Sequence, residues 1–529
     1  MRVNLRPFNW SAVYPLIASL LILYGSSFAP LSAQNLAPNI VQQANVGALP
    51  IHPLLLEMAA QQPNQRVKII VQKQTNGSTV EERITTLGGR IIDDLSIINA
   101  VSAEISAQDV TKLVQDDVRW ISYDAPTATS GGPDGSFKPT TIQNAYNAAI
   151  NVPKVWANGY QGSGIGVAIV DSGITNVMDL MGSTNNTRVV ANIAFSDGFV
   201  VNGINQMILD GYGHGTHIAG IIGGTGISSG FGSQVQYVGV APKVNLINVK
   251  VSDDKGVGTV ANVVKGLQWI LANKQQYNIR VVNISLNSAV AESYHTSPLD
   301  AAVEILWFNG ITVVASAGNN GSATLYPPAN DPFVITVGAV DDRGTTSRDD
   351  DAMASFSAYG KTVDGFAKPD LVAPGRNIVS IGGLATSALT LQHLNNVVVG
   401  GFYFRMSGTS MSAPMVSGAV ALLLQDEPNL TPDQVKYRLM ATANKSWGGY
   451  DAAKAGAGYL DVANALNGTT QQSANTGISG SKLLWSGSQP VTWNSVNWNS
   501  VNWNSVNWNS VNWNSVNWNS VNWNSDFWE

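Results

Sequence analysis

Short apolar runs alternate with longer helical runs through the middle of the chain, and this alternation limits the fold more than any other feature. The apolar runs are rich in Val and Ile and cover residues 166–170, 189–193, 244–249, 281–285, 312–316 and 334–340. The helical runs cover residues 214–222, 260–273 and 299–309. Parallel strands need long crossover connections, so the pattern predicts an α/β fold, a mostly parallel sheet with helices on both faces. In such sheets, sites form beyond the carboxyl ends of the strands.

Composition narrows the class of protein further. A chain of 529 residues with 44% hydrophobic and 12% charged residues suits a globular protein of several units. Its net charge of -6 gives no basic surface for nucleic acid. The absence of cysteine excludes disulfides, thiol catalysis and zinc-thiolate sites.

One serine stands at the start of a long apolar segment. Residues 405–414 read Arg-Met-Ser-Gly-Thr-Ser-Met-Ser-Ala-Pro and lead into an apolar run that ends at residue 425. We expect a buried helix from residue 411, with Pro414 in its first turn, where a missing N–H costs nothing, and with Ser410 at its positive end. A serine hydroxyl becomes a nucleophile when a base takes its proton and a third group orients the base. Asp171 directly follows the first apolar run, and His214 lies at a glycine-flanked helix start. His214 is therefore the candidate for the base, and Asp171 is the candidate for the group that orients it.

The segments around these three residues read Ala-Ile-Val-Asp-Ser-Gly, Gly-Tyr-Gly-His-Gly-Thr-His and Gly-Thr-Ser-Met-Ser-Ala-Pro. In this order they resemble the signature blocks of the subtilisin-like serine proteases. The resemblance implies that Ser410 attacks, His214 acts as base and Asp171 orients the base. Each residue taken alone is more often a turn, cap or packing residue, but the three blocks together favour catalysis. His217 is interpreted as a packing residue.

Acyl transfer also needs donors that point at the developing negative charge of the carbonyl oxygen. The segment Ala-Ser-Ala-Gly-Asn-Asn-Gly at residues 315–321 resembles the family block that supplies an asparagine side chain for this purpose. The resemblance implies that Asn319 is this donor, together with the backbone N–H of Ser410. Asn320 is interpreted as a turn residue beside it.

The resemblance extends to substrate binding. Residues 283–287 look like the family's edge segment that pairs with the substrate backbone, a form of strand addition. The resemblance implies a pocket that binds an uncharged side chain of the substrate residue before the scissile bond. Asn287 stands where the family usually has glycine, so it either narrows the cleft or faces solvent, and the family's specificity does not simply carry over. The implied pocket residues are Ser285, Leu286, Asn287, Ala315, Ser316, Ala317 and Gly318.

Catalysis of this kind needs no cofactor, and structural calcium is the one ion that the resemblance suggests. Asp179 matches a family carboxylate that ligates calcium, whereas the loop at residues 223–233 lacks the expected asparagine. Calcium sites need about six oxygen ligands. A surface aspartate is therefore the favoured interpretation of Asp179.

The N-terminal third suggests export and a separate small domain. Residues 1–33 read as a secretory signal peptide, with a retained membrane anchor as the alternative, and residues 34–65 as a linker. Residues 66–126 predict a ferredoxin-like β-α-β-β-α-β unit, with a capping box at residues 78–81. Its position resembles that of an inhibitory propeptide; an ordinary small domain is the alternative. Residues 127–143 are expected to be a processing loop.

The catalytic domain is expected at residues 144–467 and includes a capping box at residues 431–434. The remaining residues, 468–529, form a low-complexity tail that repeats Trp-Asn-Ser-Val-Asn. A period of five fits neither a helix face nor a sheet face. Stacked strand-turn units and a disordered linker remain open alternatives, and regular tryptophans suggest glycan contact, self-association or cell-surface retention.

These observations predict a secreted or cell-surface serine endopeptidase that acts on polypeptides and processes itself from a proenzyme, with its own propeptide as inhibitor. We expect a monomer without nucleic-acid partners or a stable membrane span. The alternative is a cell-surface or glycan-binding protein with an idle protease-like scaffold and a functional tail. A third interpretation keeps the triad for hydrolysis of esters or small amides.

Overall fold

The computed structural model describes residues 49–484, except residues 76, 130–144, 183–185, 197–198, 203–207, 232–235, 322–323 and 399. The predicted signal peptide, most of the processing loop and the repeat tail lie outside the described residues. Within the described part, no helix has both the length and the apolar character needed to cross a membrane.

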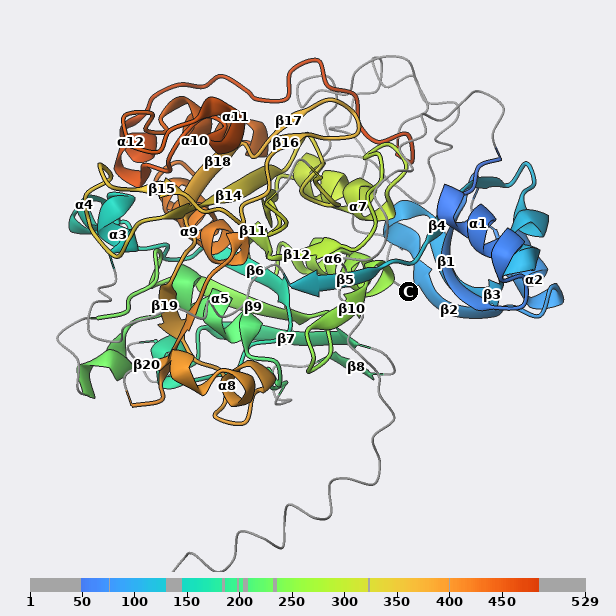
Figure 1. The fold of residues 1–529 in the computed structure, drawn as a ribbon, viewed down its shortest axis with the longest axis horizontal. Coiled ribbons are helices and arrows are strands. Elements are labelled where there is room, and N and C mark those ends of the chain that lie inside the picture. The colour runs from blue at the N-terminus through green and yellow to red at the C-terminus, as the bar shows by residue number, and fades with distance from the viewer. Residues whose placement is uncertain are drawn as a thin grey trace, which may run out of the picture. The chain divides into compact units, whose positions relative to one another are not determined.

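A mixed sheet, mostly parallel, forms the centre of the larger part of the chain (Figure 1). Its order is β15-β14-β13-β11-β6-β9-β7-β8, and β18 also pairs with β14. Neighbouring strands run parallel from β7 through to β14 and on to β18, whereas β8 and β15 are antiparallel to their neighbours. The predicted fold class is therefore confirmed. The strands are β6 (Gly166–Asp171), β7 (Val189–Ser196), β8 (Phe199–Asn202), β9 (Asn245–Lys250), β11 (Ile279–Ile284), β13 (Thr312–Ser316), β14 (Ile335–Asp341), β15 (Ala352–Met353) and β18 (Leu371–Pro374).

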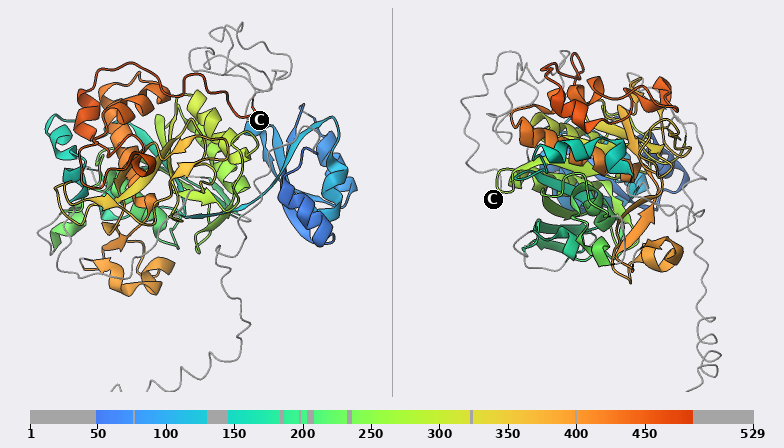
Figure 2. Two further views of the ribbon diagram at one scale, coloured as in Figure 1. Left: turned by 45° about the horizontal axis from the view of Figure 1, so that its top comes forward. Right: turned by 90° about the vertical axis from the view of Figure 1, so that its left-hand side faces the viewer.

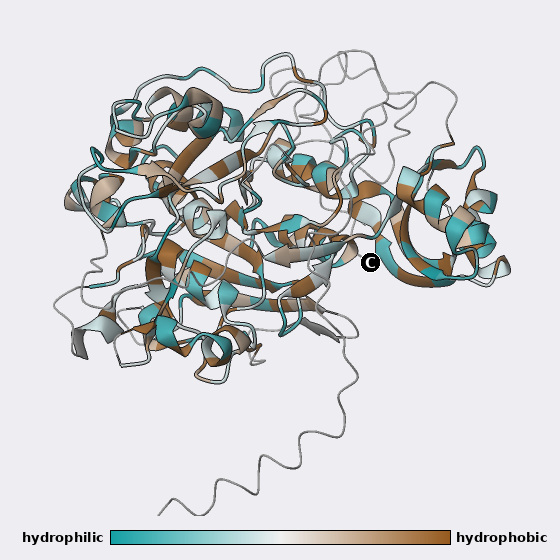
Figure 3. Cartoon of the chain, in the orientation of Figure 1, coloured by the Kyte–Doolittle hydropathy of each residue, from teal (hydrophilic) through white to brown (hydrophobic). Residues whose placement is uncertain are grey.

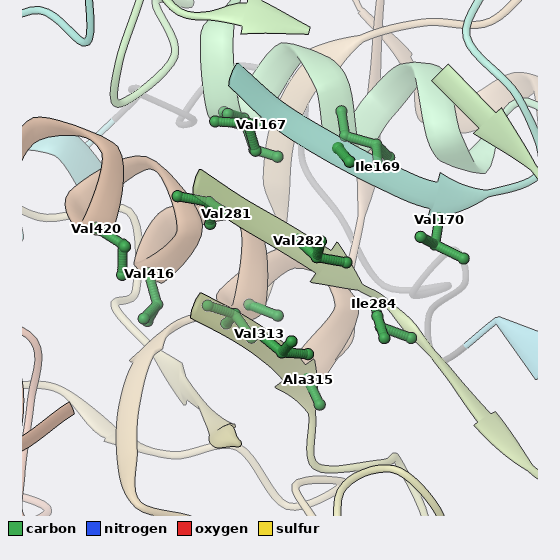
Figure 4. Packing of buried hydrophobic residues seen from close by; sticks show 14 of the residues in the cluster. Val167, Ile169, Val170, Val281, Val282, Ile284, Val313, Ala315, Val416 and Val420 are labelled. Carbon is green, nitrogen blue, oxygen red and sulfur yellow. The ribbon is translucent and has the colours of Figure 1, made fainter. Parts of the chain in front are cut away.

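The central strands are apolar on both faces because helices cover both faces. Every residue of β6 and of β13 is buried, and Figure 3 shows much of the hydrophobic colour on the strands at the centre of the larger part of the chain. Figure 4 shows how β-branched side chains of β6, β11 and β13 pack against one another and against Val416 and Val420. Such two-sided burial explains why the strands read as continuous apolar runs rather than as alternating ones.

Helices α5 (His214–Gly223) and α9 (Thr409–Asp426) contact each other and the sheet, and helices α6 (Val260–Asn273) and α7 (Pro298–Phe308) form a second contacting pair. The views in Figures 1 and 2 show helices on both sides of the strands. The helix predicted at residues 260–273 is confirmed. Thr259 caps α6 and Ser297 caps α7 through side-chain oxygens that accept backbone N–H groups.

Pro414 lies inside α9, in its second turn, so the prediction that it occupies the first turn is wrong. The helix begins at Thr409, directly after Gly408, two residues earlier than its apolar pattern indicated. A proline at this position cannot donate to the carbonyl four residues earlier, which belongs to Ser410. Ser285 Oγ donates to that carbonyl at 3.1 Å instead. A residue of the candidate site thus replaces the missing helical hydrogen bond.

The N-terminal unit has its own four-stranded antiparallel sheet in the order β2-β3-β1-β4 and its own hydrophobic core. The sequence predicted this element order, although the second helix is a 3-10 helix. The elements are β1 (Arg66–Lys73), α2 (Thr79–Thr86), β2 (Arg90–Leu95), η3 (Ser96–Ile98), β3 (Ala100–Ser106), η4 (Ala107–Leu113) and β4 (Val118–Tyr123).

Two predictions about this unit are wrong. Residues 53–61 of the supposed linker form helix α1 (Pro53–Gln61), which buries Leu55 in the unit's core, so the unit begins before residue 66. The capping box at Ser78 is absent, because Ser78 Oγ donates to Glu82 at 2.7 Å and Glu81 pairs with Lys73. Tertiary contacts thus decide both features.

The C-terminal boundary of the catalytic domain also lies later than residue 467. Ser481 N–H donates to Glu304 Oε2 at 2.7 Å, and Leu483 is buried. The capping box at Thr431 is confirmed, with Gln434 as its partner. The remaining elements are β5 (Pro126–Thr129), α3 (Tyr146–Ala149), α4 (Val152–Ala157), η5 (Met178–Leu180), η6 (Ile227–Phe231), β10 (Val257–Thr259), β12 (Leu286–Ser288), β16 (Gly360–Lys361), β17 (Ala367–Lys368), β19 (Ile378–Ile381), α8 (Ala388–Gln392), η7 (Leu394–Asn396), β20 (Val397–Val398), β21 (Tyr403–Met406), α10 (Pro432–Ala441), α11 (Ala452–Ala455) and α12 (Val462–Asn467).

Candidate active site

Asp171 and His214 meet at the carboxyl end of the sheet. Asp171 is the last residue of β6. The chain forms β9 on one side of β6 before it forms β11 on the other side. In α/β sheets, sites lie where the order of the strands reverses in this way. His214 is the first residue of α5. Its Nδ1 lies 2.8 Å from Asp171 Oδ1, and both side chains are fully buried. An ionised carboxylate only accepts hydrogen bonds, so Nδ1–H donates and Nε2 carries the lone pair.

Two glycines allow this approach. Gly213 has a φ of 102°, which brings the chain into α5 through a left-handed turn. A Cβ atom on Gly215 would lie 2.2 Å from the carbonyl oxygen of Gly173, in the turn that follows Asp171. The glycines on either side of His214 therefore let the helix start close to the strand end.

Asp210 supports the same turn and was not among the residues predicted for the site. Its Oδ1 accepts from Ser172 Oγ and Gly213 N–H, and its Oδ2 accepts from the N–H and the hydroxyl of Thr216, at 2.7–2.8 Å. Complete burial raises the pKa of Asp210, and the four hydrogen bonds oppose this rise. Asp210 links the turn after β6 to the start of α5. Its position directly before the block around His214 was the available signal.

Ser410 lies in the first turn of α9 and is fully buried. Its Oγ donates to the carbonyl oxygen of Ser285 at 3.0 Å, while Ser285 Oγ donates to the Ser410 carbonyl. His214 Nε2 has no hydrogen-bond partner within the described part of the chain. The structure thus joins Asp171 to His214 and Ser410 to Ser285, and the hydroxyl of Ser410 faces the edge segment rather than the imidazole.

Asn319 follows β13 and contacts the residue before Ser410. Its Oδ1 accepts from Thr409 N–H at 2.9 Å and from Thr409 Oγ1 at 3.0 Å. A backbone N–H needs an acceptor, so this contact identifies the oxygen of the amide and directs the NH2 group away from Thr409. Thr409 Oγ1 also accepts from Gly318 N–H at 3.0 Å. The amide is thereby held in one orientation beside the start of α9.

A short three-stranded sheet crosses the site. β5 is its middle strand and runs antiparallel to both β10 and β12. Ala128 lies opposite Asn287, Thr129 lies opposite Leu286, and Thr127 lies opposite Gly258. Residues 127–129 of the supposed processing loop therefore form a strand, and the edge segment does pair with an extended peptide, one from its own chain. The Thr129 side chain hydrogen-bonds with Tyr212, whose pKa burial raises.

Asn287 does not face solvent. Its side chain is buried, with 9% of the residue exposed, and its Nδ2 donates to the carbonyl oxygen of Ser316 at 3.1 Å. Ser316 ends β13, so the amide reaches from β12 to the neighbouring strand end. The other six predicted pocket residues are buried as well.

Asp179 is buried, which contradicts its interpretation as a surface aspartate. Its Oδ1 accepts from Ser228 N–H at 2.8 Å, and its Oδ2 accepts from the hydroxyl of Tyr403. Its carbonyl oxygen accepts from Arg188 Nη2 at 3.0 Å. Among the described residues no group of three His, Asp or Glu side chains is arranged to hold a metal ion. With protein donors on both carboxylate oxygens and a guanidinium beside them, Asp179 does not fit a calcium ligand.

His217 lies one turn after His214 and is fully buried. Its Nε2 lies 3.0 Å from the carbonyl oxygen of Phe404. Burial lowers the pKa of His217 to about 3, and the proximity of His214 adds to this effect. A neutral imidazole bound to a backbone carbonyl matches the predicted packing role.

A family model described as the Subtilase family matches residues 162–461. Serine protease AprX of Bacillus subtilis (strain 168) is 42% identical over 318 residues, which cover 58% of this chain and 67% of that protein. Subtilisin NAT of Bacillus subtilis subsp. natto is 30% identical over 398 residues, which cover 73% of this chain and 87% of that protein. The crystal structure of fervidolysin from Fervidobacterium pennivorans, a keratinolytic enzyme related to subtilisin, is similar with a TM-score of 0.59 and 26% identity. That match covers 79% of this chain and 63% of fervidolysin.

Proposed function

The chain belongs to the subtilase family of serine proteases, and we propose that it is a secreted endopeptidase that uses Ser410, His214 and Asp171 and matures by cutting its own precursor. The observation that carries the proposal is the buried contact of 2.8 Å between His214 Nδ1 and Asp171 Oδ1. This contact leaves Nε2 as the proton acceptor on the side of the ring that does not face Asp171.

The proposed reaction begins with a rotation of the Ser410 side chain. The hydroxyl leaves the carbonyl oxygen of Ser285 and turns to His214 Nε2, which accepts its proton as Oγ bonds to the substrate carbonyl carbon. The carbonyl oxygen becomes an oxyanion that accepts hydrogen bonds from the Asn319 NH2 group and the Ser410 N–H. His214 then gives the proton to the leaving amine as the C–N bond breaks. A water molecule repeats the sequence on the acyl-enzyme and releases the acid.

We propose that residues 50–129 belong to the inhibitory propeptide. Three contacts support this assignment besides β5. Asp124 Oδ1 accepts Ala261 N–H at 2.9 Å, at the positive end of α6. Gln268 Oε1 accepts Ile97 N–H at 3.1 Å, and Lys265 Nζ lies 2.5 Å from Asp93 Oδ1. The unit thus binds one helix of the catalytic domain while its last strand lies along β12.

Export rests on the predicted signal peptide at residues 1–33, outside the described residues, and on the subtilisin relatives. The repeat tail also lies outside the described residues, and a role in glycan or cell-surface attachment stays a proposal. Polypeptides are the substrate class that the family implies.

The test of the mechanism is labelling with a fluorophosphonate probe, which reacts with activated serine nucleophiles. We expect the wild-type enzyme to be labelled on Ser410 and the Ser410→Ala and His214→Ala variants to remain unlabelled. Ser412→Ala is the matched control, because the Ser412 hydroxyl on the same helix donates to the carbonyls of Ala373 and Pro374 instead. Undiminished labelling of His214→Ala would contradict the proposal.

The same variant tests self-processing. Ser410→Ala, expressed without any other protease, should accumulate as a precursor that still contains residues 50–129. Its molecular mass and N-terminal sequence report the outcome. Normal trimming of this variant under those conditions would remove self-processing from the proposal and leave the peptidase mechanism in place.

A further inference from the structure

The strand register identifies the part of the cleft that receives the substrate side chain before the scissile bond. β5 and β12 are antiparallel, with Ala128 opposite Asn287 and Thr129 opposite Leu286. A peptide that continued along this path by one residue would lie opposite Ser285. The carbonyl oxygen of Ser285 is 3.0 Å from Ser410 Oγ. The residue at that step therefore lies beside the nucleophile.

The direction of that residue's side chain follows from strand geometry. Residues directly opposite each other in an antiparallel pair point to the same face, and residues two apart in one strand share a face. A side chain opposite Ser285 therefore lies on the face that carries the side chains of Ser285 and Asn287. On this face the hydroxyl of Ser285 and the amide of Asn287 are its nearest neighbours on the edge segment.

The amide of Asn287 extends from this face towards the neighbouring strand end. Its Nδ2 is bonded to the carbonyl oxygen of Ser316, and its Oδ1 lies 3.7 Å from the position of a Cβ atom built on Gly318. Ser316 and Gly318 belong to the second wall of the pocket that the sequence predicted. The amide thus spans the gap between the two walls, with 9% of the residue exposed.

We propose that Asn287 closes this pocket, so that the enzyme cuts preferentially after Gly, Ala or Ser. This specificity rests on the proposed peptidase function of the same site. A larger side chain must displace the amide and break its buried hydrogen bond to Ser316, which leaves polar groups without partners.

The test compares tetrapeptide anilides that share their first three residues and end in Ala, Ser, Leu or Phe. We expect the mature wild-type enzyme to show kcat/KM for Ala and Ser at least about 10-fold above that for Phe, the scale on which pocket size discriminates. Asn287→Gly should raise kcat/KM for Leu and Phe about 10-fold or more and leave that for Ala nearly unchanged. Asn287→Ala is a second variant, which should shift the ratio in the same direction by a smaller factor.

Asn278→Gly is the matched control. Asn278 has a φ of 46°, lies before the first residue of β11 and so at the opposite end of that strand from the site, and donates to the carbonyl of Gly164. The Asn278→Gly variant should leave all ratios of kcat/KM between the substrates unchanged. A wild-type preference for Phe over Ala, or a ratio that neither variant at position 287 changes, would overturn the inference. Fluorophosphonate labelling of Ser410 does not depend on the pocket, so its loss would instead indicate failure of the proposed function.

Discussion

Two buried histidine–carboxylate pairs occur in different regions of the described part of this protein, and only one of them is suited to catalysis. His214 and Asp171 lie 2.8 Å apart at the end of the central sheet. His52 Nε2 lies 3.3 Å from Glu292 Oε1, where helix α1 of the N-terminal unit meets the loop after β12. The residue types and the burial are similar, so the difference must come from what else each ring and each carboxyl contacts.

The second ring nitrogen separates the two pairs. His52 Nδ1 accepts from Leu54 N–H at 3.2 Å and so caps helix α1. Its Nε2 therefore carries the proton and donates to Glu292. In His214 the contact with Asp171 uses Nδ1, and Nε2 has no partner within the described residues. Of these two histidines, only His214 has a ring nitrogen available to take a proton from a nucleophile.

The protonation state of the His52–Glu292 pair also distinguishes it from a catalytic pair. Burial lowers the pKa of His52 to about 4 and raises that of Glu292 to about 8. At neutral pH the contact is therefore a hydrogen bond between an uncharged imidazole and a protonated carboxyl group, although its geometry is that of an ion pair. A buried histidine beside a carboxyl group is thus a structural element unless donors and a nucleophile complete the site.

The largest effect is expected where a substitution makes the first pair resemble the second. Asp171→Asn keeps the size of the side chain but removes the charge that stabilises the protonated imidazole and fixes its tautomer. We expect kcat for peptide hydrolysis to fall by about 10⁴-fold. Steady-state kinetics measure this fall on a variant whose N-terminal unit has been removed by an added protease that is then separated, with the enzyme concentration fixed by absorbance.

Glu292→Gln is the matched change in the other pair. Glu292 lies outside the proposed machinery, so the mature variant should retain the wild-type kcat. An equal loss of kcat in both variants would show that the distinction between the pairs is wrong.

The sequence predicted the sheet and its helices well because parallel strands are buried on both faces and leave continuous apolar runs, as in β6 and β13. It also indicated that Asp171 orients His214, and the structure joins these two side chains, whereas the assembly of Ser410 and Asn319 with them stays a prediction. It missed features that depend on distant contacts. Nothing near Pro414 in the sequence shows that Ser285 replaces its missing hydrogen bond, and nothing near Asp179 shows that Tyr403 and Ser228 bury it.

The strand β5 was missed for a related reason. Its residues, Pro-Thr-Ala-Thr, carry no apolar alternation and precede a glycine-rich loop, so they read as part of that loop. They become a strand because β10 and β12 supply backbone partners on both sides. Asn287 is the opposite case, since the sequence identified its unusual position but could not decide between a narrowed cleft and an exposed side chain.

A smaller effect, on stability, is expected for the second pair as the pH rises. The pKa of Glu292 is raised in the folded state, so its contribution to stability is complete below its unfolded pKa of about 4.5 and is lost as the pH rises through about 8. The loss amounts to a few kcal/mol, since each pKa unit is worth about 1.4 kcal/mol. In a Ser410→Ala precursor, which keeps the N-terminal unit attached, Glu292→Gln should flatten the fall in Tm between pH 5 and pH 8. An unchanged slope would mean that Glu292 is ionised in the fold.

The smallest effect, also on stability, is expected for His52 of the second pair as the pH falls. The pKa of His52 is lowered in the folded state, so its contribution is present above its unfolded pKa of about 6.5 and is lost as the pH falls towards 4. His52→Asn keeps an acceptor for Leu54 N–H, because asparagine is among the best helix caps, but it cannot titrate. In the same precursor we expect Tm at pH 7 to change little, since loss of a cap costs only about 1 kcal/mol. The decline of Tm between pH 6.5 and pH 4 should become shallower, which thermal unfolding at matched ionic strength would detect. If the decline kept its slope in His52→Asn, the imidazole would already be protonated in the fold, and the second pair would be an ion pair like the one proposed to form at His214 during catalysis.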